Sequence, residues 1–175
     1  DLNILDTSKG IELIKGGNSH RHEEEQEESE EYNQHIWTSP TNYIKQIENI
    51  RDGLIGIDPD YADEYKANAE KYIGQIKEIR SELLKAADNL FTKYCIIFHG
   101  SLEYIAKDLG LVPLVSLSSG EGAGISAAEY NSVANGAELS KILKIDTAVT
   151  GDNNDSDAWI DAMKRNLNEI KKAAA

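Results

Sequence analysis

The chain has 175 residues, of which 40% are hydrophobic and 28% are charged, and this is the composition of a globular protein with a real core. Its formal net charge of −13 argues against a nucleic-acid partner, which would need a basic patch, and favours cationic or neutral partners such as metal ions. A single cysteine, Cys95, excludes an internal disulfide and lies in an apolar run, so we expect a buried structural thiol. No apolar run approaches the roughly 20 residues of a membrane-spanning helix.

The first part of the chain combines a short apolar segment with an acidic loop. Residues 2–14 predict a strand followed by a turn or short helix, and we expect that the natural N-terminus lies further upstream. Residues 16–34 predict a loop that carries His20 and His22. Seven of the nine residues over 23–31 are glutamates. Because like charges repel one another, this tract is typical of a solvated surface loop.

Two helices follow the loop. Ser39 supplies an N-cap and Pro40 stands at the first helical position, while Asp58 and Pro59 repeat this pattern for a second helix that runs to about Leu90. At about 1.5 Å per residue, the second helix is a rod of roughly 45 Å, either a strut between two lobes or one arm of a coiled coil. The apolar positions of the first helix are Tyr43, Ile44, Ile47, Ile50, Leu54 and Ile57.

The second half of the chain alternates strands and helices. This alternation predicts an α/β fold with a parallel sheet. The expected elements are a strand over residues 94–98, a helix over 101–110 that Gly110 ends, a strand over 111–118, a strand over 142–145 and a terminal helix over 155–175.

Three polar residues occupy positions at which metal ligands are common. His99 follows the strand over residues 94–98, Asp146 follows the strand over 142–145, and His35 precedes the capped helix. Ligands of α/β proteins bind beyond the carboxyl ends of parallel strands, and imidazole with carboxylate suits Zn²⁺ or Mn²⁺. Such a histidine is more often a hydrogen-bonded structural residue, however, and such an aspartate is more often a helix cap. The residues alone leave the site open.

Enzymatic signatures are missing from the sequence. It has no His-Glu-x-x-His pair, no Walker phosphate loop and no Gly-x-Ser-x-Gly nucleophile motif. We therefore do not expect an enzyme.

Three segments of the chain carry a family resemblance. They read "HIWTSP" over residues 35–40, "IIFHGSLEYIAKDLGL" over 96–111 and "IDTAVTGDNNDSDAW" over 145–159. In this combination they resemble the metal-binding substrate-binding proteins of bacterial ABC importers, the zinc and manganese family of adhesion-type lipoproteins. The resemblance implies an α/β fold with two α/β lobes joined by a long rigid helix, the first lobe being largely missing from this chain. The expected division is a remnant of the N-terminal lobe over 1–57, a linking helix over 58–90 and a C-terminal α/β lobe over 91–175.

The same resemblance implies a set of metal ligands. His35 is the expected ligand from the first lobe, His99 is the expected ligand from the second lobe, and Asp146 supplies the carboxylate. A fourth ligand is expected from the missing N-terminal lobe. An imidazole at His99 is similar to the zinc members, so Zn²⁺ is preferred over Mn²⁺. His20 and His22 resemble the histidine-rich loop of these members, as an auxiliary metal-gathering loop or as a simple spacer.

The resemblance also implies a role in transport. The expected protein captures a divalent transition metal in an interlobe cleft and delivers it to an ABC importer permease. We expect a monomer outside the cytoplasm, either in the periplasm or held on the membrane by an anchor in the missing segment. The alternative is a surface adhesin or interaction protein without a role in metal transport.

Overall fold

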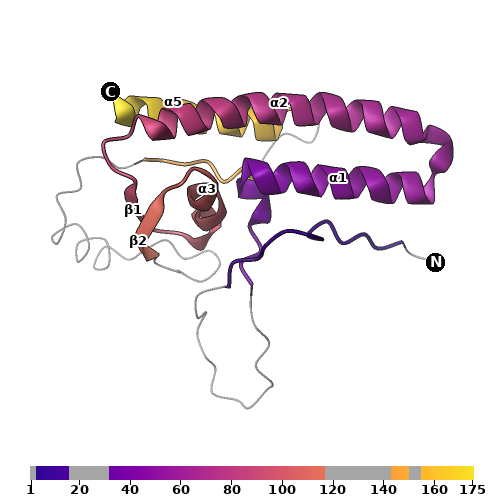
Figure 1. Cartoon of the computed structure of the whole chain (residues 1–175), viewed down its shortest axis with the longest axis horizontal. Coiled ribbons are helices and arrows are strands. Elements are labelled where there is room, and N and C mark those ends of the chain that lie inside the picture. Colours follow the sequence, from indigo (N-terminus) through magenta and orange to yellow (C-terminus); the bar gives the residue numbers. More distant parts are fainter. Residues whose placement is uncertain (1–2, 16–31, 117–142, 150–154) are drawn as a thin grey trace, which may run out of the picture.

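The computed structural model describes residues 3–15, 32–116, 143–149 and 155–175, with residues 115 and 116 described by their backbone alone. Long helices lie above a small sheet (Figure 1). The elements are, in chain order, η1 (Ile36–Thr38), α1 (Pro40–Ile57), η2 (Pro59–Tyr61), α2 (Ala62–Asp88), β1 (Tyr94–Ile97), η3 (Gly100–Leu102), α3 (Glu103–Asp108), β2 (Val112–Ser116) and α5 (Ala158–Ala174).

Helix α1 begins as its sequence predicts. The Ser39 hydroxyl accepts a hydrogen bond from the backbone N–H of Asn42 at 3.1 Å, and Pro40 occupies the first helical position. Asp58 differs from its predicted role, because its side chain caps no backbone N–H and accepts a hydrogen bond from the Tyr65 hydroxyl at 3.2 Å. The second helix therefore opens with the 3-10 turn η2 before α2 begins.

The core lies where α2 meets α5, α1 and α3. Helix α2 has 27 residues, and it buries one stripe of side chains at helical spacing. Helix α1 lies along its first part and α5 along its last part (Figure 1). The buried cluster consists of Ile76, Ile79, Leu83, Ala86, Ala87, Ile105, Leu109, Trp159, Ile160, Met163, Leu167 and Ile170.

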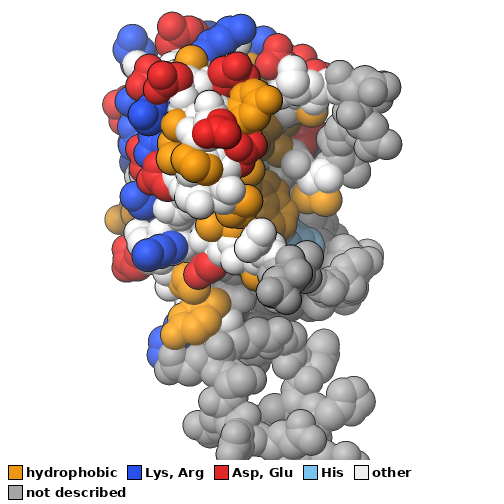
Figure 2. Space-filling view, turned by 90° about the vertical axis from the view of Figure 1, so that its right-hand side faces the viewer, with side chains coloured by type: hydrophobic (Ala, Val, Ile, Leu, Met, Phe, Trp, Pro, Cys, Tyr) orange, Lys and Arg blue, Asp and Glu red, His pale blue; other side chains and the backbone are white. Residues whose placement is uncertain are grey.

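The opposite end of the α1–α2 pair is less covered. Leu54, Ile57 and Tyr61 are more than a third exposed there. Seen from this end, hydrophobic side chains lie at the surface among acidic and basic ones (Figure 2). No helix in the described ranges is long and apolar enough to cross a membrane.

The two described strands confirm the parallel sheet. Strands β1 and β2 pair in parallel, with an irregularity between Cys95 and Ile96, and η3 and α3 form the connection between them. Gly110 ends the connection with a φ of +66°, which glycine adopts without strain. Cys95 is partly buried, and burial raises the pKa of its thiol, in agreement with a structural thiol.

Two predicted strands are wrong. Residues 143–145 lie outside the sheet, and the Asn166 side chain bonds the backbone of the residue that follows: it accepts from the Asp146 N–H at 2.6 Å and donates to the Asp146 carbonyl at 2.9 Å. Residues 3–5 also form no strand, and the bridge between Lys15 and Tyr32 is an isolated one outside β1 and β2. Ile142, His20, His22 and the glutamate tract lie outside the described residues.

Candidate metal site

The structure brings two of the three predicted ligands together. His35 directly precedes η1, and His99 follows β1 at the start of η3. Their ring centres are 5.9 Å apart, and the rings meet edge to face at 77°. His35 also lies 5.3 Å from the ring of Trp37, between centres. Two segments that are far apart in the sequence thus bring their imidazole rings next to each other.

The Asn33 side chain orients the His35 ring. Its amide oxygen lies 2.9 Å from His35 Nδ1 and accepts from the His35 backbone N–H at 3.0 Å. Because an amide oxygen only accepts, this contact places the ring proton on Nδ1 and leaves Nε2 as the basic nitrogen. That tautomer is the one in which Nε2 binds a metal ion.

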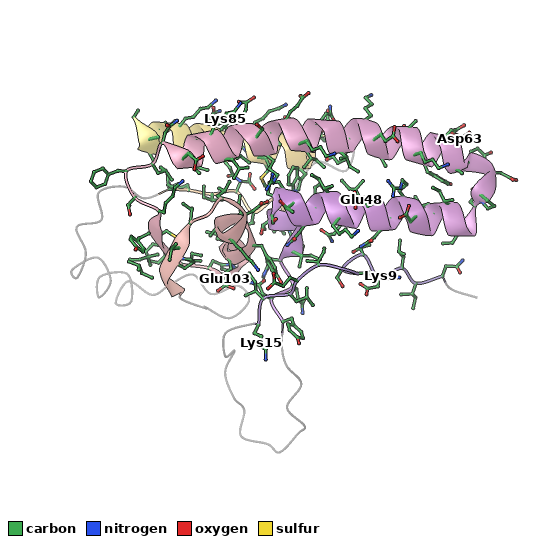
Figure 3. The ribbon with its side chains drawn as sticks, viewed as in Figure 1. Lys9, Lys15, Glu48, Asp63, Lys85 and Glu103 are labelled. Carbon is green, nitrogen blue, oxygen red and sulfur yellow. The ribbon has the colours of Figure 1, made fainter. Side chains whose placement is uncertain are left out.

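Asn33 is itself fixed by partners on the other side. Its amide nitrogen donates to the Gly100 carbonyl at 2.7 Å and to the Glu103 carboxylate at 2.9 Å. Glu103 lies at the start of α3, close to the point where the chain enters η1 (Figure 3). The backbone of Asn33 is held as well, because its N–H donates to the Ile14 carbonyl and its carbonyl accepts from the buried Tyr104 hydroxyl, both at 2.9 Å.

His99 has a local partner in Ser101. The Ser101 backbone N–H donates to His99 Nδ1 at 3.2 Å, and the Ser101 hydroxyl oxygen lies 2.7 Å from the same nitrogen. A backbone N–H only donates, so the proton of the neutral ring stands on Nε2. Binding of a metal ion by Nε2 requires this proton to move to Nδ1, from which the Ser101 hydroxyl oxygen can accept a hydrogen bond.

Asp146 is engaged elsewhere. Its Oδ2 accepts from Arg165 Nε at 3.0 Å and Nη2 at 2.7 Å, and its Oδ1 accepts from the Ala148 N–H at 2.8 Å. Burial raises the pKa of this carboxyl, but the hydrogen bonds from Ala148 and Arg165 outweigh burial and lower it overall. In the part of the chain that the structure describes, no three His, Cys, Asp or Glu side chains form a group that could hold a metal ion.

The chain beside Asp146 nevertheless reaches Trp37, next to the turn that carries His35. The Trp37 indole N–H donates to the Thr147 carbonyl at 3.0 Å, so the residue after Asp146 is bonded to the residue two after His35. The residue that follows Asp146 is therefore held beside the turn that carries His35.

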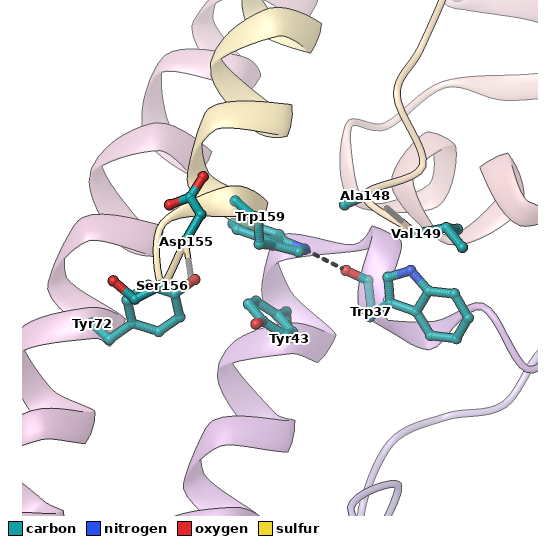
Figure 4. A pocket seen from close by; sticks show the side chains of 9 residues that line it. Trp37, Tyr43, Tyr72, Ala148, Val149, Asp155, Ser156 and Trp159 are labelled. Atoms are coloured by element: carbon teal, nitrogen blue, oxygen red, sulfur yellow. Dashed lines mark hydrogen bonds between the residues drawn. The ribbon is translucent and has the colours of Figure 1, made fainter. Parts of the chain in front are cut away.

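Three aromatic side chains, Trp159, Tyr43 and Tyr72, form an aromatic wall beside η1. The Trp159 indole N–H donates to the Trp37 carbonyl at 2.9 Å, and Trp159 stacks on Tyr43 with ring centres 4.5 Å apart (Figure 4). These rings and Tyr72 line an open pocket of about 500 Å³. Burial, and next the neighbouring Tyr43, raise the pKa of the Tyr72 hydroxyl. The wall fixes the turn that carries His35.

The residues that hold the predicted ligands were not predicted from the sequence. Asn33 and Ser101 each stand two positions from a histidine, which is a weak but local signal. Arg165 and Asn166 lie 19 and 20 residues from Asp146, respectively, and have no local signal at all.

Known proteins share this fold and are related to this chain in sequence. The zinc-binding lipoprotein AdcA of Streptococcus pneumoniae is 31% identical over 136 residues, which cover 75% of this chain and 26% of that protein. The high-affinity zinc uptake system protein ZnuA of Bacillus subtilis is 30% identical over 125 residues, which cover 66% of this chain and 38% of that protein. The chain thus spans between about a quarter and two fifths of the length of these relatives.

A solved structure gives the same fold. The Zn(II)-bound ZnuA-like domain of Streptococcus pneumoniae AdcA superposes with a TM-score of 0.72 at 21% identity, over 97% of this chain and 69% of that one. The α/β fold class is confirmed by this likeness, whereas the division into lobes stays a prediction.

The fold and the matched segments define a chain of the metal-binding substrate-binding class of ABC importers, as the resemblance indicated. A family model described as zinc-uptake complex component A, periplasmic (ZnuA), matches residues 1–142. The chain belongs to this family. The comparisons do not favour the alternative of a surface adhesin without a metal-transport role.

Proposed function

We propose that this chain binds a zinc ion between the turn that carries His35 and the turn that carries His99. The observation that carries the proposal is the 5.9 Å separation of the two ring centres. Two imidazoles that bind one tetrahedral zinc ion through nitrogens at about 2.0–2.1 Å have ring centres roughly 5 Å apart. Small side-chain rotations bring the observed pair to that separation.

Asp146 is the third ligand in this proposal. Its carboxylate must first leave Arg165 and the Ala148 N–H. The ion pair with Arg165 is partly solvated, with side chains 32% and 59% exposed, so breaking it costs about 1 kcal/mol or less. A tetrahedral zinc ion takes a fourth ligand, which water can supply.

Zinc is the preferred ion because the two central ligands are imidazoles. Manganese favours sites built from oxygen ligands, whereas two histidines with one carboxylate suit zinc. The names of the relatives AdcA and ZnuA as zinc-binding and zinc-uptake proteins support this choice. Neutral imidazoles bind the ion by coordination, without a catalysed reaction, so acid releases it.

The ion is cargo in this proposal. A protein outside the cytoplasm captures zinc and passes it to the membrane permease of an ABC importer, and the family description as a periplasmic uptake component supports this location. A relative named as a lipoprotein supports attachment to the membrane by a lipid. We propose a monomer, since one chain supplies all three ligands.

Zinc titration by calorimetry tests the proposal. We expect one-to-one binding by the chain, and a loss of at least tenfold in affinity for His35→Ala and for His99→Ala. The double variant His20→Ala/His22→Ala is the matched control, because it removes two histidines outside the pair, and it should keep the affinity. Binding that survives both single changes and is lost in the control would reject the site and assign the metal to the acidic loop.

A further inference from the structure

We infer that Asn33 is a positioning residue of the metal site, which sets the tautomer of His35 and ties that ring to the turn that carries His99. The inference rests on the proposed function, because a metal site must exist for the residue to position its ligands.

Asn33 forms two hydrogen bonds with His35 through a single atom, its amide oxygen. The amide oxygen accepts from both the backbone N–H and Nδ1 of His35, at 3.0 and 2.9 Å. The side chain is nearly inaccessible, since the residue is 9% exposed. A buried amide oxygen that accepts twice from one residue restricts the rotation of that ring and keeps its proton on Nδ1.

The hydrogen bonds of the Asn33 side-chain amide prevent a half-turn that would exchange its oxygen and nitrogen. Its nitrogen faces two groups that only accept, the Gly100 carbonyl at 2.7 Å and the Glu103 carboxylate at 2.9 Å. A reversed amide would place its oxygen against both of these and its nitrogen against the His35 N–H, so three hydrogen bonds would be lost together. Glu103 and Gly100 therefore determine, through Asn33, which nitrogen of His35 is basic.

The same amide links the two ligands. Gly100 directly follows His99, so the bond from Asn33 to the Gly100 carbonyl holds the His99 turn against the His35 turn. A Cβ atom at Gly100 would lie 3.8 Å from the Asn33 amide nitrogen, which is ordinary van der Waals contact. The turn therefore lies next to the amide and leaves room for a methyl group there.

The loss of partners of this kind costs about 10- to 100-fold in metal affinity. We expect Asn33→Leu, which has a similar size and no hydrogen bonds, to weaken zinc binding by about that factor. Asn33→Asp keeps an acceptor for His35 but sets its second oxygen against the Gly100 carbonyl and the Glu103 carboxylate, so it should keep the Nδ1–H tautomer and still weaken zinc binding. Asn49→Leu is the matched control, because Asn49 donates to the Thr7 and Lys9 carbonyls away from both histidines, and it should bind zinc normally.

The experiment combines zinc calorimetry with nitrogen NMR of the His35 ring in the metal-free chain at mildly alkaline pH. We expect the Nδ1–H tautomer in the unchanged chain, in Asn33→Asp and in the control, and a mixture of tautomers in Asn33→Leu. An unaltered tautomer and affinity in Asn33→Leu would overturn the inference and leave the proposed function standing. If Asn33→Leu does not fold, Asn33→Asp decides: loss of the Nδ1–H tautomer there overturns the inference.

The two proposals fail in different ways. A chain whose zinc binding is independent of His35 would refute the proposed function, and with it the role of Asn33 in a metal site. Weaker zinc binding in Asn33→Leu with an unchanged His35 tautomer would contradict the inference alone, because the residue would then act only through stability.

Discussion

The Arg165 guanidinium donates two hydrogen bonds to one carboxylate oxygen of Asp146, from Nε at 3.0 Å and from Nη2 at 2.7 Å. This pair holds the carboxylate that the proposed site needs. Arg165 therefore competes with a metal ion for the Asp146 carboxylate. Replacement of Arg165 reveals whether Asp146 is a ligand.

We expect Arg165→Gln to raise zinc affinity a few-fold, because the carboxylate no longer has to leave a cation before it binds metal. The gain should disappear when Asp146→Asn is added, and Asp146→Asn alone should weaken binding. Lys164→Gln is the control, since Lys164 pairs with Asp161 and not with Asp146. Calorimetry checks all four chains, and equal affinities throughout would show that Asp146 stays outside the site.

A buried carboxylate joins the start of α1 to α3. Asp108 accepts from the Ser39 and Thr41 hydroxyls, from the Thr41 backbone N–H and from Arg80, and its side chain is 6% exposed. We expect Asp108→Ala to lower the free energy of unfolding by about 2–3 kcal/mol, because these donors lose their acceptor in a buried place and the helix loses a negative group at its N-terminus.

Denaturant unfolding measures this change. Asp88→Ala is the matched control, since Asp88 pairs with Lys93 but is 77% exposed. The control should change stability by about 0.5 kcal/mol or less. Equal effects of the two substitutions would mean that the Asp108 network adds nothing to the fold.

Much of the fold follows from local pattern. The α1, α2 and α5 helices have apolar residues at helical spacing, and Ser39 with Pro40 marks the start of α1 because capping chemistry needs those residue types there. The two paired strands could also be predicted from local pattern, because they are short apolar runs bounded by turns. His35 and His99 were predicted as ligands from the family resemblance, and the structure places their ring centres 5.9 Å apart.

Contacts between distant segments account for what the sequence analysis missed. Leu143–Ile145 has the apolar content of a strand, yet Asn166 of α5 bonds the backbone of Asp146 beside it with a side chain. The pairing of Asp146 with Arg165 likewise joins a loop to a helix, and no periodicity signals it. Only the fold determines which side chain reaches which backbone.

The Asn166 amide gives a third prediction. Asn166 is fully buried, and both hydrogen bonds to Asp146 end when it is replaced. We expect Asn166→Leu to speed hydrogen exchange at the Asp146 backbone N–H by at least tenfold and to cost about 2 kcal/mol of stability. Asn168→Leu on the same helix is the control. Unchanged exchange at Asp146 would show that the loop is held without Asn166.

The thiol of Cys95 gives a pH-dependent prediction. Burial raises its pKa, so the protonated form persists to higher pH in the folded chain than in the unfolded chain. Because the thiolate is the reactive form, we expect a thiol reagent to label folded Cys95 more slowly than denatured Cys95 at neutral pH, with the difference shrinking as pH rises. Equal rates in both states would contradict this, and a colour-forming disulfide reagent measures them directly.

The two tryptophans of the chain provide a direct optical test of the site. The Trp37 ring lies 5.3 Å from His35 between centres, whereas Trp159 donates a hydrogen bond to the Trp37 carbonyl from the other side of the pocket. Zinc bound by His35 places a charge next to Trp37 and alters the surroundings of Trp37 first. We therefore expect zinc to change the fluorescence of Trp159→Phe, in which Trp37 remains, and to leave that of Trp37→Phe nearly constant. The reverse result would place the bound ion on the far side of the aromatic wall, away from the histidine pair.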